Sequence, residues 1–366
     1  MKKITKSKVI MFGMPSTEHD ISIITACLFE NANYKKIYID KSNKWWLIEN
    51  SLTPKQYTNC SGIPCIILPN SKFLYKIKGN RLKKLFEIDL ALLAFHGGSG
   101  ENGDIQGLLE IADIPYVSPS SSLSHVCYDK YLTKLVLASS GLNVVEYELI
   151  RKQDYLTNCQ NVVQTVESKF AYPLIVKPTK QGSSIGVSKV ENRTQLLKAI
   201  ETAMFYDEFV LVEKFVCAQE INVAVMRYLD GYIVSCLEQP LKNQEVFSFA
   251  DKYLAQGGKF TSPILNEHSK EEEISNLALK IATSLNASGV MRIDLLIEDK
   301  IYVNEINTIP GNLAYHLFAN KYTKTEFVEM LGKQAKIENI KKHSLVNSYQ
   351  TSVLEANSFA KTKLKK

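Results

Sequence analysis

An apolar run at residues 90–95 opens directly into a polar, glycine-rich loop, and this transition constrains the fold more than any other feature of the chain. The loop, residues 96–104, holds four glycines, one histidine and two carboxylates. In α/β folds, an apolar strand that ends in such a loop lines a polar ligand site at the carboxyl end of the strand. The pattern therefore predicts an enzyme with an α/β architecture.

Composition narrows the class of protein. The chain has 366 residues, 45% of them apolar and 22% charged, which suffices for two or three domains that each bury a core. The net charge of +6 is partly held in the first eight residues and in a lysine-rich tail, and does not form the clustered footprint of a nucleic-acid-binding protein. No window approaches the roughly 20 apolar residues of a membrane span. We expect small-molecule substrates, and neither nucleic acid nor a membrane as a partner.

The seven cysteines are odd in number and scattered, with no Cys-x-x-Cys pair and no histidine at zinc spacing. They indicate reduced thiols in a cytoplasmic protein. The basic start of the chain resembles the first part of a secretion signal, but Pro15, Glu18 and Asp20 interrupt the apolar stretch that follows. We therefore expect no secretion.

Local patterns predict an N-terminal domain at residues 1–120 with an open, parallel sheet. A strand at 8–12 is followed by a capped helix that runs to about residue 30, and the strand at 90–95 is followed by a helix at 103–112.

Two α+β domains are expected to follow, at 121–212 and 213–345, with a polar tail at 346–366. The first would contain a helix over 124–141, strands around a glycine loop at 171–190, a helix near 193–206 and a strand at 209–213. The second would contain strands at 220–226, 290–296 and 301–307 and a helix at 271–286.

The last two strands carry polar side chains at alternate positions. Arg292 and Asp294 lie on one face of the first strand, and Glu305 and Asn307 on one face of the second. Mg²⁺ prefers such oxygen ligands and commonly takes one or two carboxylates together with substrate phosphates. The alternative is a structural ion-pair cluster built around Arg292.

The glycine loop at 182–186 lies between two apolar strands, where backbone N–H groups could cover phosphate oxygens. It lacks the P-loop pattern and the helix of a dinucleotide fingerprint, so on its own it could equally be a tight hairpin. Lys177 on the preceding strand favours the phosphate site, because a lysine among apolar residues is costly unless an anion meets it.

The chain resembles the ATP-grasp fold in the order of its features. These are the lysine, the glycine loop, a carboxylate at a strand exit and the Arg-x-Asp and Glu-x-Asn strands. Flanking segments over about residues 8–335 are similar to the D-alanine–D-alanine ligase family. They are 16–22, 96–98, 100–103, 106–107, 129–130, 176–178, 182–186, 252–253, 292–294 and 304–311.

The resemblance implies a nucleotide site. Lys130 and Lys177 would grip the ATP phosphates, and Glu213 and Glu220 would hold the adenine amino group and the ribose hydroxyls. The loop at 182–186 would close over the γ-phosphate. Further nucleotide-binding residues implied in this way are Gly182, Ser183, Ser184, Lys214 and Lys252. The ligands of two Mg²⁺ ions, with Mn²⁺ as an alternative, would be Asp294, Glu305 and Asn307.

The resemblance also implies the substrate sites. Glu18 would bind the ammonium of the first D-alanine, and His96 lies where the family has a substrate-site histidine. Lys252 and Tyr253 fall on a long polar loop that covers the site in relatives and links Tyr253 to Glu18 through Ser183. Arg292 and the backbone N–H of Gly311 would stabilise an oxyanion, and the second substrate would lie at His316 and Leu317.

The implied reaction joins two D-alanines through an acyl phosphate for peptidoglycan synthesis, and homodimers occur among relatives. Asn102 and the segment 311–317 depart from the family pattern, the latter at the second-substrate subsite. Two alternatives therefore stay open. One is a ligase with D-serine, D-lactate or another amino acid as second substrate, and the other is a non-catalytic nucleotide-binding relative.

Overall fold

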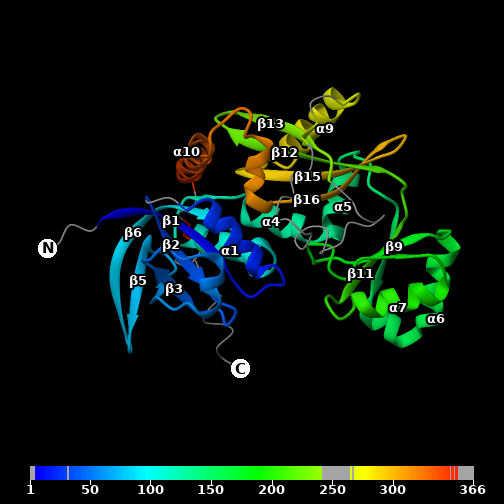
Figure 1. The fold of residues 1–366 in the computed structure, drawn as a ribbon, viewed down its shortest axis with the longest axis horizontal. Coiled ribbons are helices and arrows are strands. Elements are labelled where there is room, and N and C mark those ends of the chain that lie inside the picture. The colour runs from blue at the N-terminus through cyan, green and yellow to red at the C-terminus, as the bar shows by residue number, and fades with distance from the viewer. Residues whose placement is uncertain are drawn as a thin grey trace.

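Three β-sheets with flanking helices make up the structure, a computed structural model that describes residues 5–30, 33–240, 264–265, 268–346, 348–349 and 351–352 (Figure 1). None of the helices within these ranges is both long and apolar enough to cross a bilayer. The seven cysteines are free thiols, as expected.

The first sheet has seven strands: β1 (Lys6–Gly13), β2 (Tyr34–Ile39), β3 (Trp45–Ile48), β4 (Ile63–Ile67), β5 (Phe73–Lys78), β6 (Arg81–Leu93) and β7 (Tyr116–Val117). β1 pairs in parallel with β2 and β6, and β6 pairs in parallel with β7. From β2 to β6, successive strands are antiparallel. The expected open, parallel sheet is therefore mixed: its parallel pairs involve β1, β2, β6 and β7, and the strands from β2 to β6 are antiparallel neighbours along the chain.

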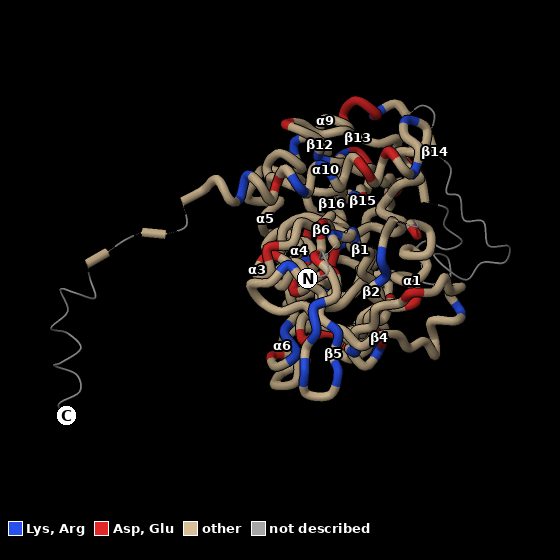
Figure 2. Tube along the Cα trace, turned by 90° about the vertical axis from the view of Figure 1, so that its left-hand side faces the viewer, with Lys and Arg blue, Asp and Glu red and all other residues tan. Residues whose placement is uncertain are grey.

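The core of this part lies where the parallel strands are covered on both faces. Residues 9–12 of β1 and 90–95 at the end of β6 are almost completely buried, as continuous apolar runs in covered parallel strands are. The associated helices are α1 (His19–Leu28), η1 (Pro54–Asn59), α2 (Gly98–Glu101) and α3 (Asp104–Ile111). Figure 2 shows that the β5–β6 hairpin carries basic residues along both of its strands.

The second sheet has the order β10-β9-β11-β8 and is antiparallel throughout. Its elements are β8 (Tyr147–Arg151), α6 (Lys152–Lys169), β9 (Leu174–Pro178), β10 (Ser188–Val190), α7 (Arg193–Ala203) and β11 (Phe209–Lys214). Helices α6 and α7 pack on this sheet. The domain boundary expected after residue 212 falls inside β11.

The single helix expected over 124–141 is instead two helices, α4 (Ser121–Tyr128) and α5 (Lys130–Ser139). Asp129 separates them, because its backbone is extended and its carboxylate accepts hydrogen bonds from the N–H groups of Tyr131 and Leu132 at 2.9 and 3.3 Å. This N-cap places Lys130 in the first turn of α5. Both helices contact β16 (Ile301–Asn307) of the third sheet.

The third sheet is antiparallel with the order β14-β13-β12-β15-β16. Its elements are β12 (Gln219–Tyr228), β13 (Gly231–Glu238), β14 (Ile264–Leu265), α9 (Glu271–Ser284), β15 (Val290–Ile297) and β16 (Ile301–Asn307), followed by η2 (Gly311–Leu317) and α10 (Lys324–His343). Helix α10 begins with a capping box between Thr323 and Glu326 and packs against β6, β7 and β12. Helix α10 thereby connects the third sheet to the first by packing against strands of both.

Candidate active site

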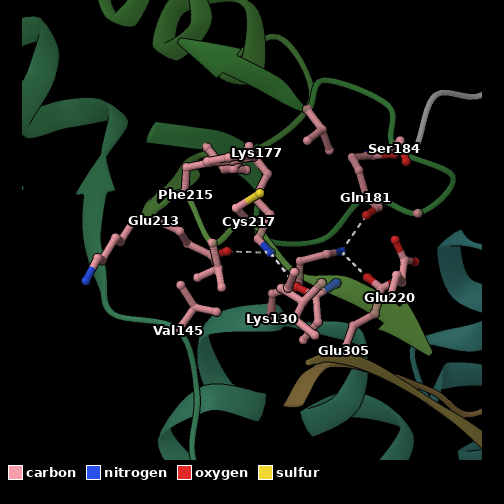
Figure 3. Close-up of a pocket in the computed structure, with 18 of the residues that line it drawn as sticks. Lys130, Val145, Lys177, Gln181, Ser184, Glu213, Phe215, Cys217, Glu220 and Glu305 are labelled. Carbon is pink, nitrogen blue, oxygen red and sulfur yellow. Dashed lines mark hydrogen bonds and ion pairs between the residues drawn. The ribbon is translucent and has the colours of Figure 1, made fainter. Parts of the chain in front are cut away.

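A cavity of about 300 Å³ lies between the second and third sheets (Figure 3). Its walls come from α5, β9, β11, β12 and β16 and from the glycine loop after β9. Among its lining residues are Lys130, Lys177, Gly182, Ser183, Ser184, Glu213, Lys214, Glu220 and Glu305. The structure thus brings together every predicted nucleotide-binding residue within the described ranges. Lys252 and Tyr253 lie outside them.

The back of the cavity holds a carboxylate clamped by two lysines. Glu213 Oε2 lies 2.9 Å from Lys177 Nζ, and Glu213 Oε1 lies 2.9 Å from Lys134 Nζ. Burial alone would raise the pKa of Glu213, but the two ammonium groups outweigh burial and lower it. The sequence predicted an anion next to Lys177, and in this structure that anion is the carboxylate of Glu213.

Lys130 lies at the front of the cavity. Its ammonium donates a hydrogen bond of 2.6 Å to the Gln181 backbone oxygen and lies 3.6 Å from Glu305 Oε2 (Figure 3). The first turn of α5 is thereby linked both to the glycine loop and to the carboxylate on β16. An anion that enters the cavity would meet this ammonium beside the loop.

The glycine loop is held in an unusual backbone conformation. Ser183 and Ser184 have φ values of 51° and 58°, which are uncommon for residues other than glycine and tend to occur at ligand sites. Gly182 is required for another reason, since a Cβ added there would lie 2.4 Å from Glu18 Oε2. The loop therefore approaches the buried carboxylate of Glu18 more closely than any side chain would permit.

The Ser183 hydroxyl donates a hydrogen bond to Glu18 Oε1. Glu18 immediately precedes α1 in the first sheet's part of the chain and is 7% exposed. A predicted substrate-binding residue and a predicted phosphate-binding loop thus meet at one point.

The carboxylates of β15 and β16 are adjacent, as the alternation predicted. Asp294 is the cross-strand partner of Glu305, and Arg292 is that of Asn307. The Arg292 Nε and Nη2 atoms donate to the two oxygens of Asp294 at 2.6 and 2.8 Å, and Asn307 Nδ2 donates to Asp294 at 3.1 Å. Burial raises the pKa of Asp294 to about 6, with Arg292 opposing this effect and Glu305 adding to it.

These contacts match the ion-pair alternative. Within the described ranges, no group of three or more His, Cys, Asp or Glu side chains is arranged to hold a metal. An ion here would therefore depend on Asp294, Glu305, the amide of Asn307 and substrate phosphates, which is the usual Mg²⁺ ligand set. A carboxylate oxygen has more than one lone pair, so Asp294 can accept from Arg292 and still face a cation.

His96 follows β6 and is buried, with Nε2 2.8 Å from Thr25 Oγ1 and a further hydrogen bond to the Ile309 backbone. Burial lowers its pKa to about 4, so the imidazole is neutral at neutral pH. Hydrogen bonds to other protein groups therefore hold the ring of His96. The ring positions the loop and does not present a free group to a ligand. His19 is also buried, with Nδ1 2.7 Å from the Met14 backbone oxygen.

Three polar residues near the site were given no role from the sequence: Glu101, Lys134 and Glu238. Glu101 accepts a 2.8 Å hydrogen bond from the Gly97 N–H, and burial together with the Glu18 charge raises its pKa to about 8. Lys134 could have been noticed, because it lies four residues after Lys130 and so shares a face of the same helix. No local sequence signal singles out Glu238.

The predicted second-substrate residues lie on η2. His316 Nε2 is 3.0 Å from Glu238 Oε1, and Asn222 Nδ2 donates to the other oxygen of Glu238 at 3.1 Å. Leu317 is completely buried in the core, so its side chain cannot contact a ligand and only its backbone could. Residues 312–314 have φ values of 50° to 52°, a left-handed run that begins beside Gly311.

An antiparallel sheet pair that encloses a cavity lined by lysines and carboxylates under a glycine loop defines the ATP-grasp class of enzymes. The family model described as the D-ala D-ala ligase N-terminus matches residues 7–119, and the model of the C-terminus matches residues 136–328. The chain belongs to the D-alanine–D-alanine ligase family.

Individual relatives agree with this. The D-alanine–D-alanine ligase of Thermosipho melanesiensis is 38% identical over 94% of this chain and 97% of that protein. Among solved structures, the D-alanine–D-alanine ligase of Helicobacter pylori has a TM-score of 0.73 at 28% identity and covers 91% of this chain and 98% of that one. The VanG D-Ala:D-Ser ligase of Enterococcus faecalis has a TM-score of 0.76 at 25% identity, with 91% and 100% covered.

Proposed function

We propose that this enzyme uses ATP and Mg²⁺ to join two D-alanines into D-alanyl-D-alanine for peptidoglycan synthesis. The observation that carries the proposal is the hydrogen bond from Ser183 to Glu18. It brings the residue expected to hold the first D-alanine against the loop expected to hold the γ-phosphate. The two reacting groups would therefore meet beside this bond.

The chemistry runs in two steps. A carboxylate is a poor acyl donor, so an oxygen of the first D-alanine attacks the γ-phosphorus, which releases ADP and leaves an acyl phosphate. The amine of the second D-alanine then attacks the carbonyl carbon, a C–N bond forms, phosphate leaves with the oxygen that attacked, and the amine loses a proton. Lys130 and Lys177 would neutralise charge on the transferring phosphoryl group.

Arg292 and the Gly311 N–H would stabilise the oxyanion of the second step. Arg292 has five N–H donors, and Nε and one Nη2 donor are used by Asp294, so others remain for the substrate. Asp294 also holds the guanidinium in place.

Asp294, Glu305 and Asn307 would hold Mg²⁺, or Mn²⁺ in its place. Burial raises the pKa of Asp294 most, Arg292 opposes this effect, and the negative charges of Glu305 and Glu220 add to it. A divalent cation would offset these negative charges. When bound, the ion would neutralise charge on the phosphates.

ADP release with a panel of D- and L-amino acids tests the proposal. We expect D-alanine to support turnover and L-amino acids to fail, and Glu305→Gln to lower turnover at least about 100-fold because it removes a metal charge. Glu298→Gln is the matched control, since Glu298 is an exposed carboxylate at the turn between β15 and β16. Normal turnover by Glu305→Gln would show that the carboxylate cluster is structural.

We further propose three domains close to the expected boundaries, a cytoplasmic location and a homodimer, which the family resemblance supports. Light scattering of the purified full chain tests the assembly.

A further inference from the structure

The β5–β6 hairpin lies at the end of the long molecular axis opposite to β9 and β11 of the nucleotide cavity (Figure 1). Residues 78–84, which include its turn, are all exposed. The segment from 70 to 86 contains six lysines and arginines and no acidic residue. The hairpin is thus a basic projection remote from the candidate active site.

The strand register sets like charges directly opposite one another. Lys76 pairs with Lys83, and Lys78 pairs with Arg81. Residues at paired positions share a face, so these four cations form one cluster, which we call the cationic face. Like charges placed directly opposite destabilise a sheet. In the part of the chain that the structure describes, none of the four has an acidic partner.

The other face of the hairpin is largely apolar. It carries Tyr75, Ile77 and Leu82, and Leu82 is 48% exposed. Lys84, which shares this face, lies with Nζ 4.2 Å from the centre of the Phe73 ring. An exposed leucine therefore lies close to the turn, on the face opposite to the cationic face.

We propose that this hairpin docks the protein onto an anionic phospholipid surface. With the turn of the hairpin directed into the surface, lipid phosphates would relieve the repulsion within the cationic face, and Leu82, near the turn on the opposite face, would enter the apolar boundary below the headgroups. A polynucleotide would supply phosphates but no apolar layer for Leu82. This departs from the sequence-based expectation of no membrane partner, and it concerns surface contact without a spanning segment.

Docking at this hairpin leaves the cavity accessible, because the two lie at opposite ends of the molecule (Figure 1). The hairpin contains none of the proposed site residues. Substitutions on the cationic face should therefore leave ligase turnover unchanged.

Co-sedimentation of the full chain with vesicles tests the proposal. We expect binding to phosphatidylcholine mixed with phosphatidylglycerol, no binding to phosphatidylcholine alone, and loss of binding at high salt. The triple variant Lys78→Gln, Arg81→Gln, Lys83→Gln should weaken partitioning about a hundredfold, at roughly 1 kcal/mol for each charge. The matched control Lys198→Gln, Lys280→Gln, Lys300→Gln removes three exposed lysines elsewhere and should bind as the parent does.

Leu82→Ser should weaken vesicle binding without changing the salt dependence. Unfolding temperature and turnover of each variant show that the fold is intact, and removal of the repulsion should not lower the unfolding temperature. Equal binding to both kinds of vesicle, no binding to the acidic vesicles, or equal losses in the two triple variants would overturn the proposal. So would an RNA competitor that removes the protein from vesicles and binds the same hairpin more tightly.

Discussion

The ammonium group of Lys134 lies 2.9 Å from Glu213 Oε1, and the two side chains are 1% and 4% exposed. Lys177 holds the other oxygen of Glu213 and lines the cavity, whereas Lys134 does not line it. Lys134 can therefore keep Glu213 paired while Lys177 turns toward a phosphate.

Lys134→Met should destabilise the protein and weaken ATP binding, because Lys177 would become the only counter-ion of Glu213. Removing one partner of a buried pair costs about 3 kcal/mol. Denaturant unfolding gives the stability, and calorimetric titration gives the Kd for ATP. Lys198→Met, on the exposed face of α7, should change the free energy of unfolding by less than about 0.5 kcal/mol. Equal free energies of unfolding for the two variants would mean that the buried pair does not contribute to stability.

His96 should make the protein sensitive to acid. Its folded pKa is lowered to about 4, so the unfolded chain binds more protons once the pH falls below the unfolded value of about 6.5. The stability due to neutral His96 is present above that value and is lost as the pH falls toward 4, by about 3 kcal/mol in all. His96→Gln should remove this loss, so that its free energy of unfolding falls less than the parent's as the pH drops from about 6.5 to about 4, measured by denaturant unfolding.

The exposed His125 provides the control for this measurement, and His125→Gln should retain the parent's slope. The raised pKa values of Glu101 and Asp294 act in the opposite direction over this range, so the informative quantity is the difference between the parent and His96→Gln profiles. A difference that does not change between the two pKa values of His96 would contradict its buried, neutral state.

Gly182→Ala should abolish most of the turnover, because the added methyl group would lie 2.4 Å from Glu18 Oε2. The loop or Glu18 must move, which would break the Ser183 contact and misplace the phosphate. We expect a loss of about 100-fold, as for a misplacement of about 1 Å. Gly231→Ala is the control, since a Cβ there meets no atom within 4 Å. Comparable turnover in the two variants would argue against close contact between loop and Glu18.

His316→Ser should change the KM for the second substrate, or the choice among D-alanine, D-serine and larger residues, and leave the KM for ATP unchanged. His316 is bound to Glu238, which is ionised because His316 and Arg292 lower its pKa against the effect of burial. Serine removes the imidazole and with it one of the two partners of Glu238, the other being Asn222. Glu238→Gln, measured in parallel, separates direct recognition from positioning: it should reproduce the effect only if Glu238 orients the ring.

Unchanged acceptor preference and KM in His316→Ser would assign recognition to the η2 backbone alone. Residues 312–314, which precede His316 in η2, are all held at positive φ. The η2 backbone therefore has a defined geometry that could support such recognition.

The sequence predicted those features that depend on local pattern. Alternation along two strands correctly placed Asp294 beside Glu305, since a period of two fixes which side chains share a face. The cost of a buried lysine led to the prediction of a phosphate next to Lys177; the structure places the Glu213 carboxylate there, and the phosphate site stays a prediction. The break at Asp129 was missed, although an aspartate before a helix is a common N-cap, because the apolar spacing continued across it.

Features that depend on distant segments could not be predicted in this way. The direction of β3 to β5 is set by pairing with neighbours and not by their own residues. The left-handed conformation of Asn312, Leu313 and Ala314 contradicts local preference and is maintained by tertiary packing, with Leu313 and Ala314 fully buried. The Glu238 contact with His316 joins residues 78 positions apart.

Transfer of oxygen from substrate to phosphate tests the central claim most directly. D-alanine labelled with ¹⁸O in its carboxylate is incubated with ATP, Mg²⁺ and the enzyme, and the inorganic phosphate is analysed by mass spectrometry. If the γ-phosphate activates the carboxylate, each phosphate released during dipeptide formation carries one ¹⁸O atom. Phosphate without label, released at the rate of dipeptide formation, would contradict the acyl-phosphate route and with it the proposed roles of Lys130, Lys177 and the glycine loop.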